Sequence, residues 1–142
     1  MAITSNQAMA WAEARKHAVL ITLRQDGRAQ SSDVSYTVVD DAIVVSLTAT
    51  RAKTANMRRD SRVVVHITDP DTWSYVSFDA VAELGPVTTD PNDEAANALV
   101  DYYGRVAGEA HPDWDEYRAA MISERRQLAY LRPSSAVGQI HG

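Results

Sequence analysis

Short turns join the first three predicted strands of this chain, and they constrain the fold more than any other feature. Residues 17–24, HAVLITLR, are rich in β-forming side chains, and the QDGR that follows carries the Asp-Gly pair typical of tight hairpins. A returning strand at 29–39, a turn of two aspartates and a third strand at 42–49 come next. Parallel neighbours would need long crossovers, so these strands should pair antiparallel. The pattern predicts an antiparallel barrel and argues against a doubly wound sheet.

The rest of the chain adds helices and further strands to this barrel. The expected elements are a helix at 7–16, a short helix at 51–60 with Thr50 as N-cap, strands at 61–69 and 72–84, helices starting near Asp90 and Pro112, and two closing short strands separated by Pro133. No internal repeat is visible, and 142 residues suit one domain. We therefore predict a single α+β domain over residues 1–142, mainly β.

Several classes of chemistry are excluded by composition. The chain has no cysteine, which excludes disulfides, thiolate metal sites and a cysteine nucleophile. The four histidines lie on different predicted elements without ligand spacing, so no metal site is predicted. Redox chemistry would then need a bound organic cofactor. No apolar run approaches the roughly 20 residues of a membrane span, and the N-terminal segment does not have the apolar core of a signal peptide. We expect a cytoplasmic protein.

One basic segment stands out in a chain of net charge −5. TRAKTANMRRDSR, residues 50–62, contains one acid, Asp60, and five basic residues: Arg51, Lys53, Arg58, Arg59 and Arg62. Basic residues in the first turn of a helix are unfavourable for the helix itself, but a bound phosphate there could accept the free N–H groups and pair with the cations. An exposed basic helix that serves solubility is an equal alternative. Nucleic acid is a weaker one, because no further basic stripes exist.

Three stretches, in this order and at these spacings, carry a family resemblance. They are DGRAQSSDVSY at 26–36, the motif Arg51-Ala52-Lys53-Thr54-x-Asn56 with the following Arg58-Arg59-Asp60, and Trp73-Ser74-Tyr75. The sequence resembles the split β-barrel flavin and deazaflavin proteins of the pyridoxamine 5′-phosphate oxidase-like superfamily. Within it, the chain is most similar to small actinobacterial reductases that use coenzyme F420, an 8-hydroxy-5-deazaflavin. The resemblance covers nearly the whole chain.

The resemblance implies a split antiparallel β-barrel with Greek-key character, flanked by short helices. It also implies a homodimer with the cofactor in a groove between subunits. By position, Arg51, Lys53 and Asn56 match the phosphate ligands, and Trp73 and Tyr75 match aromatic residues near the cofactor at the interface. The implied cofactor-binding set is Gln30, Ser31, Ser32, Val34, Ser46, Thr50, Arg51, Lys53, Asn56, Arg58, Trp73 and Tyr75. Asp33 departs from the neutral residue expected beside the ring.

The implied activity is that of an oxidoreductase in which the reduced deazaflavin gives a hydride to a small organic acceptor, such as a quinone, an enone or a tetrapyrrole. No catalytic side chain is assigned, although Tyr36 and Tyr75 are candidate proton donors, with solvent as the alternative. Arg58, Arg59 and Arg62 exceed the needs of one phosphate and are candidates for the oligoglutamate tail of F420. An FMN-binding oxidase or electron carrier and a noncatalytic F420-binding protein remain alternatives.

Overall fold

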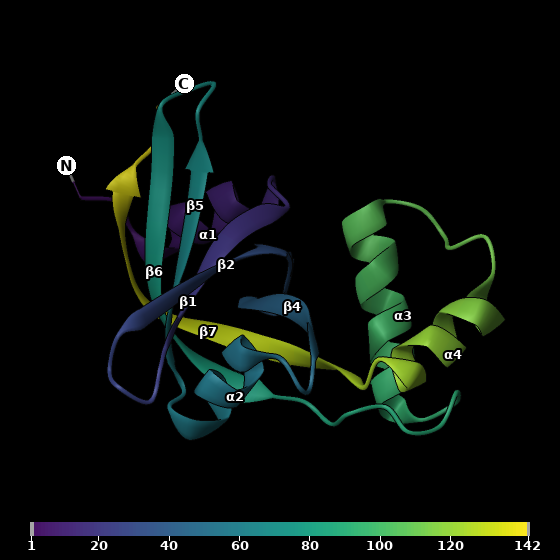
Figure 1. Cartoon of the computed structure of the whole chain (residues 1–142). Helices are drawn as coiled ribbons and strands as arrows, with labels where there is room; N and C mark the ends of the chain where they lie inside the picture. The colour runs from purple at the N-terminus through teal and green to yellow at the C-terminus, as the bar shows by residue number, and fades with distance from the viewer. Residues whose placement is uncertain (1, 142) are drawn as a thin grey trace.

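The early hairpins form the first part of a curled antiparallel sheet. The computed structural model describes residues 2–141, and its seven strands follow the order β2-β1-β5-β6-β7-β4-β3 (Figure 1). The strands are β1 His17–Leu23, β2 Ala29–Ser35, β3 Thr37–Val39, β4 Ala42–Thr48, β5 Arg62–Asp69, β6 Ser74–Leu84 and β7 Arg126–Gln139. The helices are α1 Ser5–Glu13, α2 Ala52–Arg59, α3 Glu94–Ala107 and α4 Trp114–Ser123. This is a split barrel of the α+β, mainly β class, as predicted.

The predicted strand at 29–39 is interrupted at Tyr36. β2 pairs with β1 and β3 pairs with β4, which place the two segments at opposite ends of the strand order. The chain therefore passes from one edge of the curled sheet to the other at this residue. Tyr36 is fully buried, and its hydroxyl donates to the carbonyl of Ala12 at 2.6 Å. This contact holds α1 against the barrel, and the burial of Tyr36 away from solvent argues against a role as proton donor.

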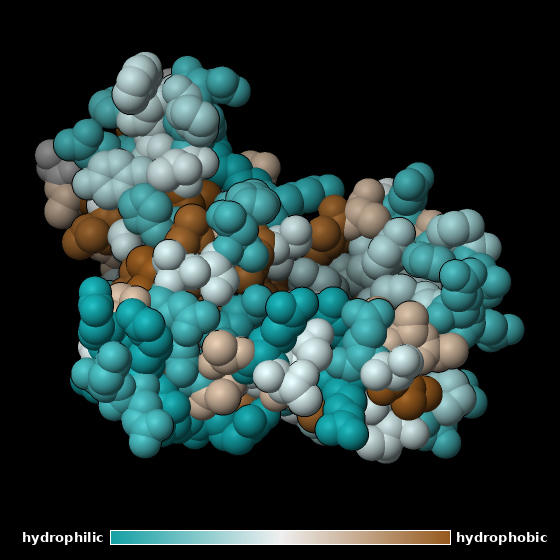
Figure 2. All heavy atoms as spheres, viewed as in Figure 1, coloured by the Kyte–Doolittle hydropathy of each residue, from teal (hydrophilic) through white to brown (hydrophobic). Residues whose placement is uncertain are grey.

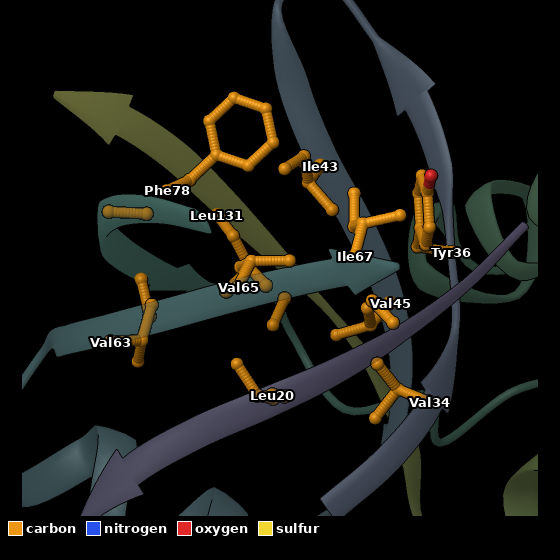
Figure 3. Close-up of a cluster of buried hydrophobic side chains, with 14 of the residues drawn as sticks. Leu20, Val34, Tyr36, Ile43, Val45, Val63, Val65, Ile67, Phe78 and Leu131 are labelled. Carbon is orange, nitrogen blue, oxygen red and sulfur yellow. The ribbon is translucent and has the colours of Figure 1, made fainter. Parts of the chain in front are cut away.

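The barrel interior follows from the two-residue period of its strands. Alternate residues of β1, β4, β5 and β6 point inward and form one apolar cluster, which includes Leu20, Val45, Val65 and Phe78 (Figure 3). A second, smaller cluster lies between β4, β7 and the helices α3 and α4 and is centred on Leu99. Figure 1 shows these two helices on one side of the barrel. The second cluster therefore attaches the helical pair to the outside of the sheet.

β7 is one long strand, whereas two short strands separated by Pro133 were expected. Pro133 lies opposite Ala80, and Ser135 lies opposite Asp79, so Ser134 is an inserted residue. This bulge accommodates the proline, which has no N–H to give to the ladder. It also changes which residues face inward along the strand.

The helix ends also differ from the expected ranges. α1 begins at Ser5 because Thr4 and Gln7 form a capping box. α3 begins after Asp93, whose side chain caps the Ala96 N–H, and ends at Gly108 in the left-handed conformation. In the part of the chain that the structure describes, no helix combines the length and the apolar character that a membrane crossing requires.

The outer face of the sheet carries exposed apolar side chains. Figure 2 shows hydrophobic atoms gathered over the barrel, between more hydrophilic regions above and below. A depression of about 370 Å³ is lined by residues of β1, β5, β6 and β7, among them Ile21, Val64 and Val81. Val81 is 49% exposed and Val137 is 66% exposed. We call this surface, made of Ile21, Leu23, Val64, Trp73, Tyr75, Val81 and Val137, the outer apolar face.

Candidate functional site

The start of α2 has no side-chain cap. Its N-cap is Arg51, which has an extended backbone and makes no side-chain hydrogen bond to the helix. The prediction that Thr50 is the N-cap is therefore wrong by one residue. In contrast, side chains cap α1, α3 and α4. The first-turn N–H groups of α2 are therefore open to an external acceptor, and the residues placed beside them are cationic.

The five basic residues of the segment at 50–62 fall into two groups. Arg62 pairs with Asp60 at 2.8 Å, and Arg59 donates to the carbonyl of Leu23 at 2.8 Å. Within residues 2–141, Arg51, Lys53 and Arg58 form no ion pair, and the one hydrogen bond of the Arg58 side chain, to Ala49, is long at 3.5 Å. Three cations thus remain available for a ligand, and the other two are committed to the fold.

Lys53 lies in an environment that favours an anion. Partial burial lowers its pKa, and the positive charges of Arg51 and Arg126 lower it further. Like charges held together in this way destabilise the protonated amine. A bound phosphate would relieve this repulsion, and the uncapped N–H groups of α2 would add donors. These residues therefore fit a phosphate group.

A groove of about 400 Å³ joins Lys53 to the barrel strands and the helical pair. Its lining includes three of the predicted cofactor-binding residues, Val34, Ser46 and Lys53, which come from β2, β4 and α2. The remaining lining residues are Asp33, Ser35, Tyr102, Val106, Tyr117, Met121 and Arg126. One residue predicted to bind the phosphate and two predicted to lie beside the ring thus line the same groove. Residues of α3 and α4 form its other wall.

Asn56 has no free hydrogen-bonding group. Its amide nitrogen donates to Thr22 and to Gln30, each at 3.1 Å, and its oxygen accepts from Arg59 at 2.9 Å. Its exposed fraction is only 6%. Asn56 therefore ties α2 to β1 and β2 and orients Gln30.

The predicted residues of β2 divide between its two faces. Gln30, Ser32 and Val34 share one face, while Ser31 and Asp33 point to the other. Asp33 is exposed, 3.7 Å from His17 Nε2. β2 is an edge strand in the sheet order, so its outer backbone groups are open to the polar edge of a planar ring.

Trp73 and Tyr75 lie away from the groove within this single chain. Trp73 is 85% exposed and has a positive φ of 58°, which is unfavourable for a bulky residue. The ring of Tyr75 lies 5.7 Å from that of His66, and both line a separate depression of about 480 Å³ together with Trp73. One chain does not bring these aromatic residues to the Lys53 groove.

The groove also includes residues that the sequence did not single out. Arg126 stands opposite Thr48 across the β4–β7 ladder, a pairing between segments almost 80 positions apart that no local pattern reveals. Tyr102 donates to the carbonyl of Ser35 at 2.8 Å, and burial raises its pKa. Burial also raises the pKa of Tyr117 to about 12. Both phenols therefore stay protonated near neutral pH.

Known proteins share this fold. The family model described as pyridoxamine 5′-phosphate oxidase matches residues 5–134. A conserved hypothetical protein from Mycobacterium tuberculosis is 23% identical, with a TM-score of 0.77 over 98% of this chain and 86% of the other. A structure described as an F420 reductase is 21% identical, with a TM-score of 0.65 over 89% and 93%.

Other structures of the same fold carry different descriptions. A FAD-binding protein from Mesorhizobium loti is 15% identical, with a TM-score of 0.69 over 97% of this chain and 93% of the other. Heme proteins occur among the similar structures as well. At these identities the likeness concerns the fold, which accommodates more than one kind of planar cofactor.

Proposed function

The chain belongs to the pyridoxamine 5′-phosphate oxidase family, and on this premise we propose that it is a reductase dependent on coenzyme F420. The observation that carries the proposal is the groove in which Lys53, flanked by Arg51 and Arg126, meets the ring-side positions Val34 and Ser46. A phosphorylated planar cofactor needs both a cationic site for its phosphate and a strand beside its ring. The similar structure described as an F420 reductase supports a deazaflavin, rather than a flavin, as this cofactor.

In this proposal the residues of the chain bind and orient the cofactor. Arg51 and Lys53 hold the phosphate at the open start of α2, and the edge of β2 lies beside the ring, with Gln30 held in place by Asn56. When bound, the reduced deazaflavin supplies a hydride to a small organic acceptor such as a quinone, an enone or a tetrapyrrole, and a proton completes the reduction. Tyr75 and solvent are the remaining proton sources, since Tyr36 is buried in the core.

We further propose that two copies pair through the outer apolar face. Trp73 and Val137 are 85% and 66% exposed, and a monomer would leave this surface in water. Paired barrels would cover it and could bring Trp73 and Tyr75 of one copy toward the cofactor of the other. Light scattering at micromolar concentration should give the mass of a dimer. A monomeric mass contradicts this part of the proposal.

Titration of the purified protein with F420 and with FMN, followed by fluorescence, tests the cofactor assignment. We expect tighter binding of F420, and Lys53→Ala should weaken it about 10- to 150-fold, because a hydrogen bond to a charged group contributes roughly 1.5–3 kcal/mol. Lys16→Ala, which removes an exposed lysine outside the groove, is the matched control. Stoichiometric FMN without F420 binding would move the protein to the flavin alternative, which the FAD-binding relative supports. Tight F420 binding without turnover would indicate a noncatalytic binding protein.

A further inference from the structure

We propose that Arg126 is a third cationic ligand of the phosphate held beside Lys53, and that this phosphate replaces Glu124 as the partner of Arg126. The inference deepens the proposed function and concerns the same groove. It adds a residue from β7 to the predicted cofactor-binding residues that line the groove, which come from β2, β4 and α2. It also assigns a competing role to an acid at the end of α4.

The backbone fixes Arg126 next to the segment that leads into α2. Arg126 is the first residue of β7 and lies opposite Thr48, the last residue of β4. The carbonyl of Arg125 accepts from the N–H of Ala49 at 2.9 Å, and the carbonyl of Arg126 accepts from Thr88 at 3.0 Å. Only the short loop at 49–51 separates this ladder from the start of α2. The position of Arg126 is therefore set by main-chain bonds on both sides.

The side chain of Arg126 lines the same groove as Lys53. Its positive charge acts on Lys53 strongly enough to lower the pKa of that amine, as does the charge of Arg51. Asp33 is the acid that lines this groove, and it lies 3.7 Å from His17. The charges of Arg51 and Arg126 thus act on Lys53 together, and an anion bound beside Lys53 would reduce this repulsion.

The present partner of Arg126 is a weak competitor. Nε and Nη2 of Arg126 both donate to the same oxygen of Glu124, at 3.2 and 3.0 Å. The Glu124 side chain is 46% exposed, and exposed pairs of this kind contribute little because water and salt screen them. A phosphate shared by three cations offers more charge and several acceptor oxygens. Exchange of Glu124 for the phosphate is therefore favourable.

The proposal predicts effects of opposite sign for the two partners. Arg126→Gln should weaken FMN and F420 binding by about tenfold, equivalent to about 1.4 kcal/mol, with little effect on riboflavin, which has no phosphate. Glu124→Gln should strengthen binding of the phosphorylated compounds at least twofold, a lower bound of roughly RT ln 2, because it frees Arg126. Arg132→Gln is the matched control, since Arg132 also lies on β7 and pairs with an exposed acid, Glu83.

Lys53 provides a second readout that needs no cofactor. Arg126→Gln should raise the pKa of Lys53, measured by NMR of its side-chain amine, because a neighbouring cation is gone. Inorganic phosphate should raise the same pKa in the unaltered protein, and less so in Arg126→Gln. If Arg126→Gln does not fold, Arg126→Ala serves for the pKa measurement, and Glu124→Gln, which leaves the arginine in place, tests the competition by itself.

Three results would overturn the inference: an unchanged Lys53 pKa in a folded Arg126 variant, equal losses of FMN and riboflavin binding, or weaker binding in Glu124→Gln. Failure of the proposed function looks different. A protein that binds neither F420 nor FMN, but whose Lys53 responds to phosphate and to Arg126→Gln as described, would keep the anion site and lose the reductase assignment. Loss of cofactor binding in Lys53→Ala, with full binding in Arg126→Gln, would keep the proposed cofactor site and overturn the role of Arg126 in it.

Discussion

The amide of Asn56 donates a hydrogen bond to the side chain of Gln30, 3.1 Å away. Both residues belong to the cofactor-binding set predicted from the sequence, yet they bind one another. Asn56 also bridges to the fully buried hydroxyl of Thr22 and to Arg59. Asn56 therefore acts by positioning, because its amide groups are used in contacts within the chain and fix the strand that would face the ring.

The first prediction follows from this contact. Asn56→Ala should lower the free energy of unfolding of the cofactor-free protein by about 1–3 kcal/mol, because it leaves buried polar partners unsatisfied. Urea unfolding measures the change. Asn97→Ala is the control, since Asn97 is exposed and accepts one bond from Arg118. If Asn56→Ala keeps full stability and loses only cofactor affinity, Asn56 is a direct ligand instead.

Tyr36→Phe should distinguish a structural role of the Tyr36 hydroxyl from a role as proton donor. The variant removes the hydroxyl donor of the buried Ala12 carbonyl, which keeps the N–H of Arg15 at 3.1 Å, so we expect a loss of about 0.5–1.5 kcal/mol in unfolding free energy. Cofactor affinity and the rate of acceptor reduction should stay within twofold of the unaltered protein, a change of about 0.4 kcal/mol. A large fall in rate with unchanged stability would return Tyr36 to the list of proton donors.

The turn between β3 and β4 contains two aspartates in the left-handed region. Asp40 has a φ of 48° and Asp41 a φ of 63°, and glycine adopts such angles without steric cost. Asp41→Gly should therefore raise the free energy of unfolding by up to about 1 kcal/mol. Asp71 lies in a turn but does not have a positive φ, so Asp71→Gly should not raise the free energy of unfolding. A thermal melt compares the two variants.

Acid should weaken the start of α3. The Asp93 carboxylate accepts N–H bonds from Thr89 and Ala96 and a further bond from Thr88, which hold its pKa at about 2. Because the folded pKa is depressed, the stabilisation is complete above the ordinary pKa near 4 and is lost as the pH falls toward 2. Asp93→Asn should remove this part of the pH dependence. Equal acid sensitivity of the two proteins would contradict the assignment.

Arg58 and Arg59 should behave differently despite being adjacent. Arg59 is held by Leu23 and Asn56, so Arg59→Ala should reduce stability. Arg58 is exposed, and within residues 2–141 its side chain makes a single long hydrogen bond, which leaves it for the carboxylates of an F420 tail. Arg58→Ala should therefore weaken the dependence of F420 affinity on ionic strength. FMN affinity, measured over the same salt range, is the control and should not change its slope.

Local patterns in the sequence predicted most of the strands and the position of α2 correctly. The Asp-Gly turn, the alternation in 17–24 and the basic first turn of α2 are all short-range signals, and each lies where the structure has it. Two segments differ: the predicted strand at 29–39 is interrupted at Tyr36, and the two short strands predicted around Pro133 form one strand, β7. A two-residue period cannot distinguish one strand from two that pair with different neighbours.

Long-range pairing explains what the sequence could not predict. Arg126 reaches the groove only because β7 lies beside β4, and Pro133 stays within the strand only because β6 supports a bulge opposite it. The helices α3 and α4 contribute Tyr102 and Met121 to the groove, and nothing in the local sequence links these two residues to the site. Such contacts depend on the packing of distant segments, which residue spacing does not encode.

The position of β7 in the sheet has a consequence for synthesis of the protein. β7 lies between β6 and β4 and is the strand that joins the two parts of the sheet. Until residues 126–139 leave the ribosome, β4 and β6 each have an unpaired edge, and both edges are flanked by apolar residues. Barrel closure must therefore follow translation of the last strand. A chain arrested before Arg126 would expose two unpaired strand edges that can pair with other chains, and we expect chaperones to bind it.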